Sequence, residues 1–227
     1  NLPGLNINPN AVISGNIFTA NTAIYGGGLY VSHSPTATLN NNRIFHNSAT
    51  GGGGLFLNES RNVAVINTIA ARNAVSVTAS EGYIQNSSAR LLHTTLAGST
   101  VGYGLYVDGA STAALTNTIL VSQTVGIHAT EGSTATLNGV LWFGNIDDTG
   151  GAGSIDVTND LTGAPAFVDP GGDDYHLRAG SAALCQGVDA GVRSDIDGDV
   201  RSTTLPDLGA DEFVKHHILL PLVMRSW

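Results

Sequence analysis

The segment Asp195-Ile-Asp197-Gly-Asp199 places carboxylates at alternate positions near the C-terminus. Carboxylate oxygens at this spacing are typical of the first half of a calcium-binding loop, in which a bidentate acid is expected at the twelfth position. Pro206 stands at that position here, so other acids would have to complete the cage. The alternative is a solvated turn whose Asp side chains accept hydrogen bonds from backbone amides. Ca²⁺ is the only cofactor that the sequence leads us to consider.

Polysaccharide cleavage is the enzymatic chemistry to consider for this chain. A lyase needs a basic side chain to remove a sugar proton, and Arg43 close to His46 is the nearest approach to such a cluster. A glycosidase needs paired carboxylates. Of the acids before residue 165, only Asp147 and Asp148 adjoin, and neighbours on a strand point to opposite faces. The sequence favours a protein without catalysis and assigns no catalytic residue.

Aromatic side chains offer another kind of site. Trp142, Tyr30 and Tyr106 could stack on sugar rings of a cell-surface glycan. The alternative is that each packs over a coil of the fold. Cys185 is the single cysteine of the chain, so no internal disulfide can form.

These residues lie on a chain that repeats itself at a period of about 21 to 27 residues. We predict one inward-facing column from aliphatic residues at this spacing: Ile17, Ile44, Ile69, Leu96, Ile119 and Val140. A polar column follows at a turn position, where stacked side chains can form a hydrogen-bond ladder. Its members are Asn21, Asn47, Asn73, Ser99, Gln123 and Asn145.

A further apolar column holds Leu29, Leu55, Leu105, Ile127 and Ile155. Ten residues later, four of these coils carry another aliphatic residue: Leu39, Val65, Leu115 and Leu137. The third coil has extra residues over 75–92, so either Val77 or Ile84 could take its place in the column.

Apolar and polar residues alternate in short pieces such as GLYVS and GLFLN, which is the period of a β-strand. Short strands in register predict an all-β fold, a right-handed parallel β-helix (β-solenoid) of about six coils. We divide the chain into coils over 1–165, an irregular Asp- and Gly-rich segment over 166–213 that caps the C-terminal end, and an apolar tail over 214–227.

The stretches FTANTAIYGGGLYV (18–31) and FHNSATGGGGLFL (45–57) resemble the Phe-x-x-Asn and Gly-Gly-aliphatic repeats of polymorphic outer-membrane proteins. Residues 174–213, from DYHLRAGSAALC to DLGADEF, resemble the ending of secreted bacterial β-helix proteins of the choice-of-anchor Q type. The resemblance implies export, a right-handed parallel β-helix and association with a cell surface. It implies no catalytic residues.

Composition limits the partners. The 227 residues carry a formal net charge of -9, and nucleic acid binding would need clustered Lys and Arg. The apolar run near the end is far shorter than the roughly 20 residues of a transmembrane helix. The chain begins at Asn1 instead of Met, which we interpret as processing of an exported, extracellular protein.

The tail supplies a hypothesis for assembly. A solenoid with uncovered ends exposes unpaired strand edges, and an apolar strand from one subunit could add to the next. Contacts of this kind generate open filaments. We expect the protein itself to be the partner, through the tail residues Ile218, Leu219, Leu220, Leu222 and Val223.

Overall fold

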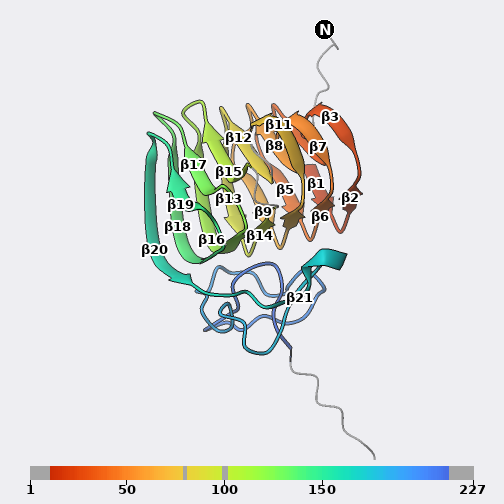
Figure 1. Cartoon of the computed structure of the whole chain (residues 1–227), viewed down its shortest axis with the longest axis vertical. Coiled ribbons are helices and arrows are strands. Elements are labelled where there is room, and N and C mark those ends of the chain that lie inside the picture. The colour runs from red at the N-terminus through yellow and green to blue at the C-terminus, as the bar shows by residue number, and fades with distance from the viewer. Residues whose placement is uncertain (1–10, 79–80, 99–101, 215–227) are drawn as a thin grey trace, which may run out of the picture.

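The computed structural model describes residues 11–78, 81–98 and 102–214 of the chain. Over these residues the chain winds as a parallel β-solenoid of about six coils (Figure 1). The helical structure in the described ranges is one 3₁₀ turn at Pro170–Gly172, and no helix there is long and apolar enough to cross a membrane. The predicted fold class is confirmed.

The coils build three parallel sheets, of which sheets A and C run through the stack and sheet B includes only the first three coils. Sheet A begins with two runs of strands, the first being β1 (Ala11–Ser14), β5 (Ala37–Asn40), β9 (Val63–Ile66) and β13 (Ser88–Leu92). The second run is β2 (Ile17–Thr19), β6 (Arg43–Phe45), β10 (Ile69–Ala71) and β14 (Thr95–Ala97). The two runs join in the long strands β16 (Thr112–Val121) and β18 (Thr134–Phe143), and β20 (Ser154–Thr162) pairs with β18.

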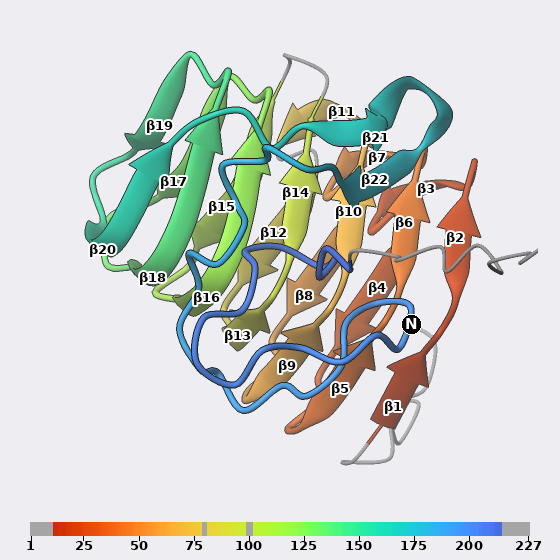
Figure 2. The ribbon, with the colours of Figure 1, turned by 90° about the horizontal axis from the view of Figure 1, so that it is seen from below.

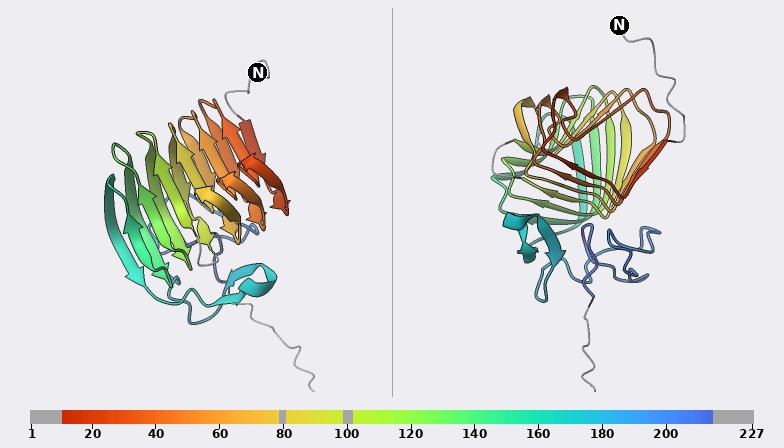
Figure 3. Two further views of the ribbon diagram at one scale, coloured as in Figure 1. Left: turned by 45° about the horizontal axis from the view of Figure 1, so that its top comes forward. Right: turned by 90° about the vertical axis from the view of Figure 1, so that its right-hand side faces the viewer.

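The other two sheets complete the coils. Sheet B comprises β3 (Thr22–Tyr25), β7 (Ser48–Gly51) and β11 (Ala74–Thr78). Sheet C comprises β4 (Leu29–Ser32), β8 (Leu55–Asn58), β12 (Gly82–Gln85), β15 (Tyr103–Asp108), β17 (Val125–Ala129) and β19 (Asp147–Gly150). Seen along the stack, the coils enclose a single elongated interior (Figure 3, right).

Two of the predicted apolar columns are inside the coils. Leu39, Val65, Leu115 and Leu137 pair in register with one another and with Leu91. Leu29, Leu55, Leu105 and Ile127 also share one register position. Burying a large aliphatic side chain contributes roughly 1.5–3 kcal/mol, so these columns stabilise the stack.

The third coil follows neither alternative that the sequence left open. Gly82 takes the position opposite Leu55 and Leu105, while Ile84 lies two residues further on and Val77 is exposed. Ile155 does not extend this column, because it belongs to β20 and pairs with Ala135.

The column built on Ile17 is wrong in register. Ile44 and Leu96 point into the coil, but Ile69 and Ile119 stand one register position away and belong to a separate cluster on the outside. A shift of one residue moves a strand side chain to the opposite face of the sheet. Ile17 also points outward and is 66% exposed.

The polar ladder is confirmed where the structure describes it. The Asn21 side chain donates to Asn47 Oδ1 at 3.0 Å, and the Asn47 side chain donates to Asn73 Oδ1 at 3.0 Å. The amide of Gln123 donates to Asn145 Oδ1 at 3.0 Å. Ser99 lies outside the described residues. A second ladder was not predicted: it begins at the backbone amide of Ser34, and each following serine hydroxyl accepts from the serine amide of the preceding coil, namely Ser60, Ser87, Ser111 and Ser133.

The corner between the two runs of sheet A needs a left-handed backbone. Asn41, Asn67 and Asn117 occupy this corner with φ of 54°, 43° and 56°, and His93 occupies it in the coil between Asn67 and Asn117 with φ of 50°. Asn tolerates this conformation better than most residues because its short polar side chain can hydrogen-bond nearby backbone. Gly15 and Gly139 occupy the same corner in other coils.

After β20 ends at Thr162, residues 163–214 turn back and lie along the outside of sheet A (Figures 1 and 2). This returning segment contains the antiparallel hairpin β21 (Phe167–Asp169) and β22 (Asp174–Leu177) and is otherwise irregular. It therefore covers the flank of the coils, whereas the sequence predicted a cap over their end.

The flank beneath the returning segment is apolar. The outward side chains of sheet A pack against the segment in one core cluster that includes Ile69, Ile119, Leu141, Leu177 and Leu208. The second run of sheet A, in β6, β10, β14 and the end of β16, is thus buried on both faces, and strands of that kind lose the alternation of apolar and polar residues. This burial explains why the register of the Ile17 column could not be read correctly.

Candidate functional site

The Asp195 side chain closes its own turn. One of its carboxylate oxygens accepts hydrogen bonds from the amides of Asp197 at 2.9 Å, Gly198 at 2.9 Å and Asp199 at 2.8 Å. The other oxygen accepts from the amide of Glu212 at 3.0 Å, and Asp195 is fully buried. The turn with Asp–amide hydrogen bonds is therefore what the structure contains, and the three predicted carboxylates do not converge on one calcium position.

Asp197 points away from that turn, toward the coils. Its Oδ1 lies 2.6 Å from a guanidinium nitrogen of Arg43, and its Oδ2 lies 2.7 Å from Nε2 of His176. His176 Nδ1 lies 2.5 Å from Asp174. Partial burial would lower the pKa of His176, but the hydrogen bonds to Asp174 and Asp197 outweigh it and raise the pKa.

Asp211 completes this group of charges. It is buried, and one of its oxygens accepts a hydrogen bond from the amide of Leu177 at 2.7 Å. Burial raises the pKa of Asp211 to about 6, and the nearby carboxylates of Asp195 and Asp197 act in the same direction. Oxygen and nitrogen ligand atoms of His176, Asp197 and Asp211 all lie within 4.8 Å of one another.

A second set of ionic contacts lies further along the flank. His46 Nε2 is 2.8 Å from a carboxylate oxygen of Asp173, and Arg72 is 3.5 Å from the other oxygen. Arg72 also donates to the carbonyls of Pro170 and Gly171. Arg43 and His46, the candidate basic cluster for a lyase, therefore both bind carboxylates of the returning segment.

The corner asparagines also bind the returning segment. The Asn41 side chain donates to the carbonyl of Ile196 at 3.3 Å, and Asn67 donates to the carbonyl of Ser194 at 2.8 Å. Asn117 both donates to the carbonyl of Val188 and accepts from its amide. Three of the residues that turn the coils thus also bind the returning segment.

Arg201 lies at the centre of this junction and is 2% exposed. Its guanidinium donates to Asn67 Oδ1 at 3.1 Å, to the carbonyl of Ala210 at 2.6 Å and to the carboxylate of Glu212 at 3.1 Å. Nothing in the local sequence distinguishes Arg201 from an exposed arginine, because its partners lie on other segments.

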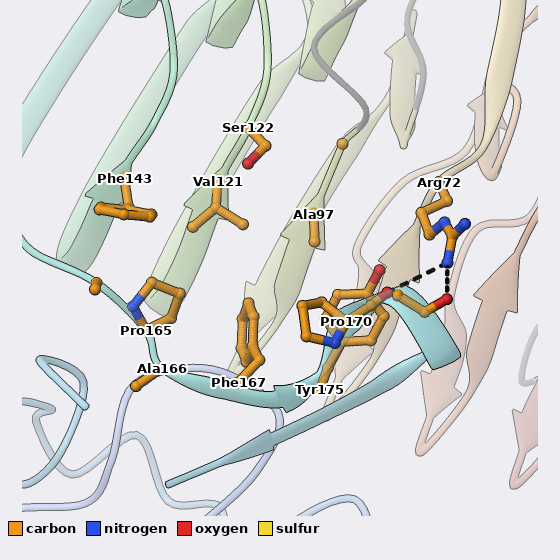
Figure 4. A pocket seen from close by; sticks show the side chains of 13 residues that line it. Arg72, Ala97, Val121, Ser122, Phe143, Pro165, Ala166, Phe167, Pro170 and Tyr175 are labelled. Carbon is orange, nitrogen blue, oxygen red and sulfur yellow. Dashed lines mark hydrogen bonds between the residues drawn. The ribbon is translucent and has the colours of Figure 1, made fainter. Parts of the chain in front are cut away.

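A groove of about 490 Å³ lies between the flank and the start of the returning segment (Figure 4). Its walls are mostly apolar, with Val121 and Phe143 from the coils facing Pro165 and Phe167 of the segment. Arg72 stands at one end, where its hydrogen bonds to the segment are drawn. The guanidinium of Arg72 at the end of the groove is therefore already engaged by carbonyls of the returning segment.

The outer face of sheet C carries a ladder of aromatic rings. Tyr30, Phe56, Tyr83, Tyr106 and His128 share one register position on successive strands. Phe56 and Tyr83 are stacked with ring centroids 4.5 Å apart, and Tyr106 and His128 are stacked at 4.9 Å. Tyr30 and Tyr106, two of the predicted sugar-stacking residues, therefore belong to one surface.

Neighbouring rings of the ladder cover part of one another's surface, since each ring contacts the next. Tyr30 is the most open of these positions, with 47% exposure. Asp108 beside the ladder accepts hydrogen bonds from Tyr83 Oη at 3.0 Å, from Gln85 at 3.2 Å and from Thr130 at 2.8 Å. Trp142 does not contribute to any platform, because it is 3% exposed and packs inside the coils.

Glu81 is a buried acid that the sequence did not single out. It is fully buried, and its Oε2 accepts from the Asn73 side chain at 2.6 Å. This contact places a carboxyl group where the next asparagine of the ladder would lie. Burial raises the pKa of Glu81 to about 8, although the hydrogen bonds from Asn73 act in the opposite direction. In the sequence, the only sign that the asparagine ladder changes here was the set of extra residues in the third coil.

The fold and its ladders define a β-solenoid stabilised by stacked side chains. A family model described as a right-handed β-helix region matches residues 1–140, which is more than half of the chain, and the protein belongs to that family. The match ends within β18 and does not include the returning segment. The searches of curated proteins and of solved structures found no match.

Proposed function

We propose that the protein is a non-catalytic extracellular β-helix, with a structural or adhesive role, that associates end to end through its coils. The extracellular location is supported by the resemblance of residues 174–213 to the endings of secreted β-helix proteins. The absence of catalysis is supported by the engagement of Arg43 and His46 in ionic contacts with the returning segment.

The observation that carries the proposal is the open edge of the last coil. The returning segment lies along the flank, so within the described ranges β19 pairs only with β17, and β20 only with β18. Ile155 and Val157 of β20 extend two interior columns but remain only partly buried. An unpaired parallel edge that continues an apolar core is suited to adding another coil.

Charge favours one mode of association. The last coil carries four exposed acids, namely Asp147, Asp148, Asp156 and Asp160. Two such ends would repel each other. Residues 11–32 contain no charged side chain, and Ala11 and Ile13 begin the same two columns that Ile155 and Val157 end. A contact between the last coil of one copy and the first coil of another is heterologous, which generates a filament.

The test is sedimentation velocity across a range of concentrations, together with negative-stain electron microscopy. Ile146, on the last coil, is 73% exposed, and Val200, on the returning segment, is 82% exposed. Ile146→Lys is expected to abolish association, and Val200→Lys is the matched control that preserves it. Deleting residues 218–227, which lie outside the described residues, tests the tail hypothesis separately. A monomer at every concentration would contradict the proposal.

Binding of a surface glycan is the second candidate function, and the aromatic ladder of sheet C is the observation that favours it. Tyr30 and Tyr106 flank hydrogen-bonding groups of Asn58 and Asp108. Tyr30→Ala is expected to abolish retention of the protein on a column of immobilised acidic polysaccharide. The same change at Tyr175, a buried residue of the returning segment, serves only as a check on folding. Unsaturated sugar products in the same assay would instead indicate a lyase.

A further inference from the structure

We propose that His176, Asp197 and Asp211 bind one divalent transition-metal ion, for which Zn²⁺ is the best match, and that the ion joins three parts of the returning segment. Each residue offers one ligand atom, and these atoms lie within 4.8 Å of one another. They come from β22, from the Asp195 turn and from the stretch that follows Leu208, so one ion would link stretches that no disulfide can link.

The orientation of His176 suits a ligand. Its Nδ1 is held by Asp174 at 2.5 Å, while Nε2 faces Asp197 Oδ2 at 2.7 Å. A carboxylate on the far nitrogen is the usual arrangement around a metal-binding histidine, since it fixes the ring and its tautomer. Arg43 contacts the other oxygen of Asp197, so an ion that displaces the Nε2 proton of His176 would take the place of the hydrogen bond between Nε2 and Oδ2.

Asp211 adds a largely buried carboxylate to the group. Asp211 is 6% exposed, and one of its carboxylate oxygens accepts a hydrogen bond from the Leu177 amide. No residue in the described ranges donates a hydrogen bond to its other oxygen. Burying a carboxylate next to Asp195 and Asp197 is unfavourable unless a positive charge compensates. A bound metal ion would supply that charge.

The donor set selects the kind of ion. Zn²⁺ accepts one imidazole nitrogen and two carboxylate oxygens, and three protein ligands leave a fourth position for water. Calcium prefers six to eight oxygen ligands. Asp195 cannot add to such a set, because both of its oxygens already accept backbone amides.

The test starts from the full-length protein treated with a chelator and dialysed. Isothermal titration with ZnCl₂ is expected to show one site, and the thermal midpoint is expected to rise with Zn²⁺ concentration. Co²⁺ is expected to give the visible absorption of a four-coordinate site. CaCl₂ is expected to change neither the heat of titration nor the midpoint.

Variants locate the site. His176→Gln and Asp211→Asn are expected to abolish Zn²⁺ binding, and Asp174→Asn is expected to weaken it by about 10- to 100-fold. His46→Gln is the matched control, because His46 also contacts a carboxylate of the returning segment. The double variant His216→Gln, His217→Gln controls for the paired histidines near the C-terminus. Both controls are expected to bind Zn²⁺ as the unchanged protein does.

The outcomes separate cleanly. Absence of Zn²⁺ binding by the unchanged protein, or its persistence in Asp211→Asn, would overturn the proposal. Loss of binding in the His216, His217 variant would do the same, because it would place the ion on those residues. Should His176→Gln or Asp211→Asn fail to fold by circular dichroism, the Co²⁺ spectrum and affinity of Asp174→Asn decide the matter.

Discussion

The coils and the returning segment are stabilised in different ways. In the coils, the same kind of residue recurs at the same position, as in the asparagine and serine ladders, and each member contacts only its neighbours in the stack. The returning segment has no repeat, and apart from the corner asparagines its polar contacts with the flank come from individual charged groups such as Arg43, His46 and Arg201. Repetition therefore distributes stability along the coils, whereas the segment depends on a few individual groups.

The buried charges follow the same division. Arg201, Asp195, Asp207 and Asp211 are all buried in the returning segment, while Glu81 is the buried acid of the coils in the described ranges. A change of one charged residue should therefore affect the segment strongly and the coils weakly. The four predictions below test this contrast, from the largest expected effect to the smallest.

Arg201→Met is expected to lower the free energy of unfolding by about 3–5 kcal/mol, because it leaves buried carboxylates without their guanidinium. Urea unfolding and limited proteolysis of the returning segment measure the effect. Arg193→Met is the control, since the ion pair of Arg193 with Asp189 is exposed and should contribute little. Equal stability of the two variants would show that the segment does not depend on Arg201.

Ile119 and Leu120 are adjacent, fully buried and on opposite faces of β16. Leu120→Ala is expected to cost about 2–5 kcal/mol and to increase amide hydrogen exchange throughout the neighbouring coils. Ile119→Ala is expected to lower the free energy of unfolding by a similar amount, but to increase amide hydrogen exchange mainly in residues 163–214. Identical exchange patterns for the two variants would contradict the separation of coils and segment.

Glu81 should make the coils depend on pH. Its pKa in the folded protein, about 8, lies above the ordinary value of 4.5, so the folded state binds the proton more tightly. Its contribution to stability is fully present below pH 4.5 and is lost as the pH rises toward 8, with a slope of up to about 1.4 kcal/mol per pH unit. Glu81→Gln should remove this slope, as urea midpoints between pH 5 and 8 would reveal. Parallel curves for the two proteins would count against a protonated Glu81.

The smallest effect is expected at Asn41. This residue forms a left-handed corner, and its side chain donates hydrogen bonds to the returning segment. Asn41→Gly keeps the left-handed corner but removes the weak hydrogen bonds to the segment, so we expect a cost of about 1 kcal/mol or less. Asn41→Ala loses the same bonds and also strains the corner, which should add about 1 kcal/mol. Thermal unfolding of both variants distinguishes the two contributions. A smaller cost for Ala than for Gly would contradict the role of the left-handed corner.

Much of the coil architecture could be predicted from the sequence. The columns through Leu55 and Leu115 and the ladder from Asn21 to Asn73 were read correctly, because stacked coils repeat a local pattern of strand and turn. The Asp195 turn was one of two alternatives, and its local geometry decided in favour of amide hydrogen bonds. The sugar-stacking role of Trp142 was wrong, since an aromatic residue next to a turn can point inward as readily as outward.

By itself, the sequence determined the β-solenoid, its coil length and most of its inward columns, because these depend on residue types that recur at short, regular distances. Only the tertiary structure decided where residues 163–214 lie. Their packing buries the outer face of the second run of sheet A. That face is apolar, which hides the alternation that would assign Ile69 and Ile119 to it. It also brings Arg43, His176 and Asp197 together from distant parts of the chain, and no local pattern encodes which distant charges will meet.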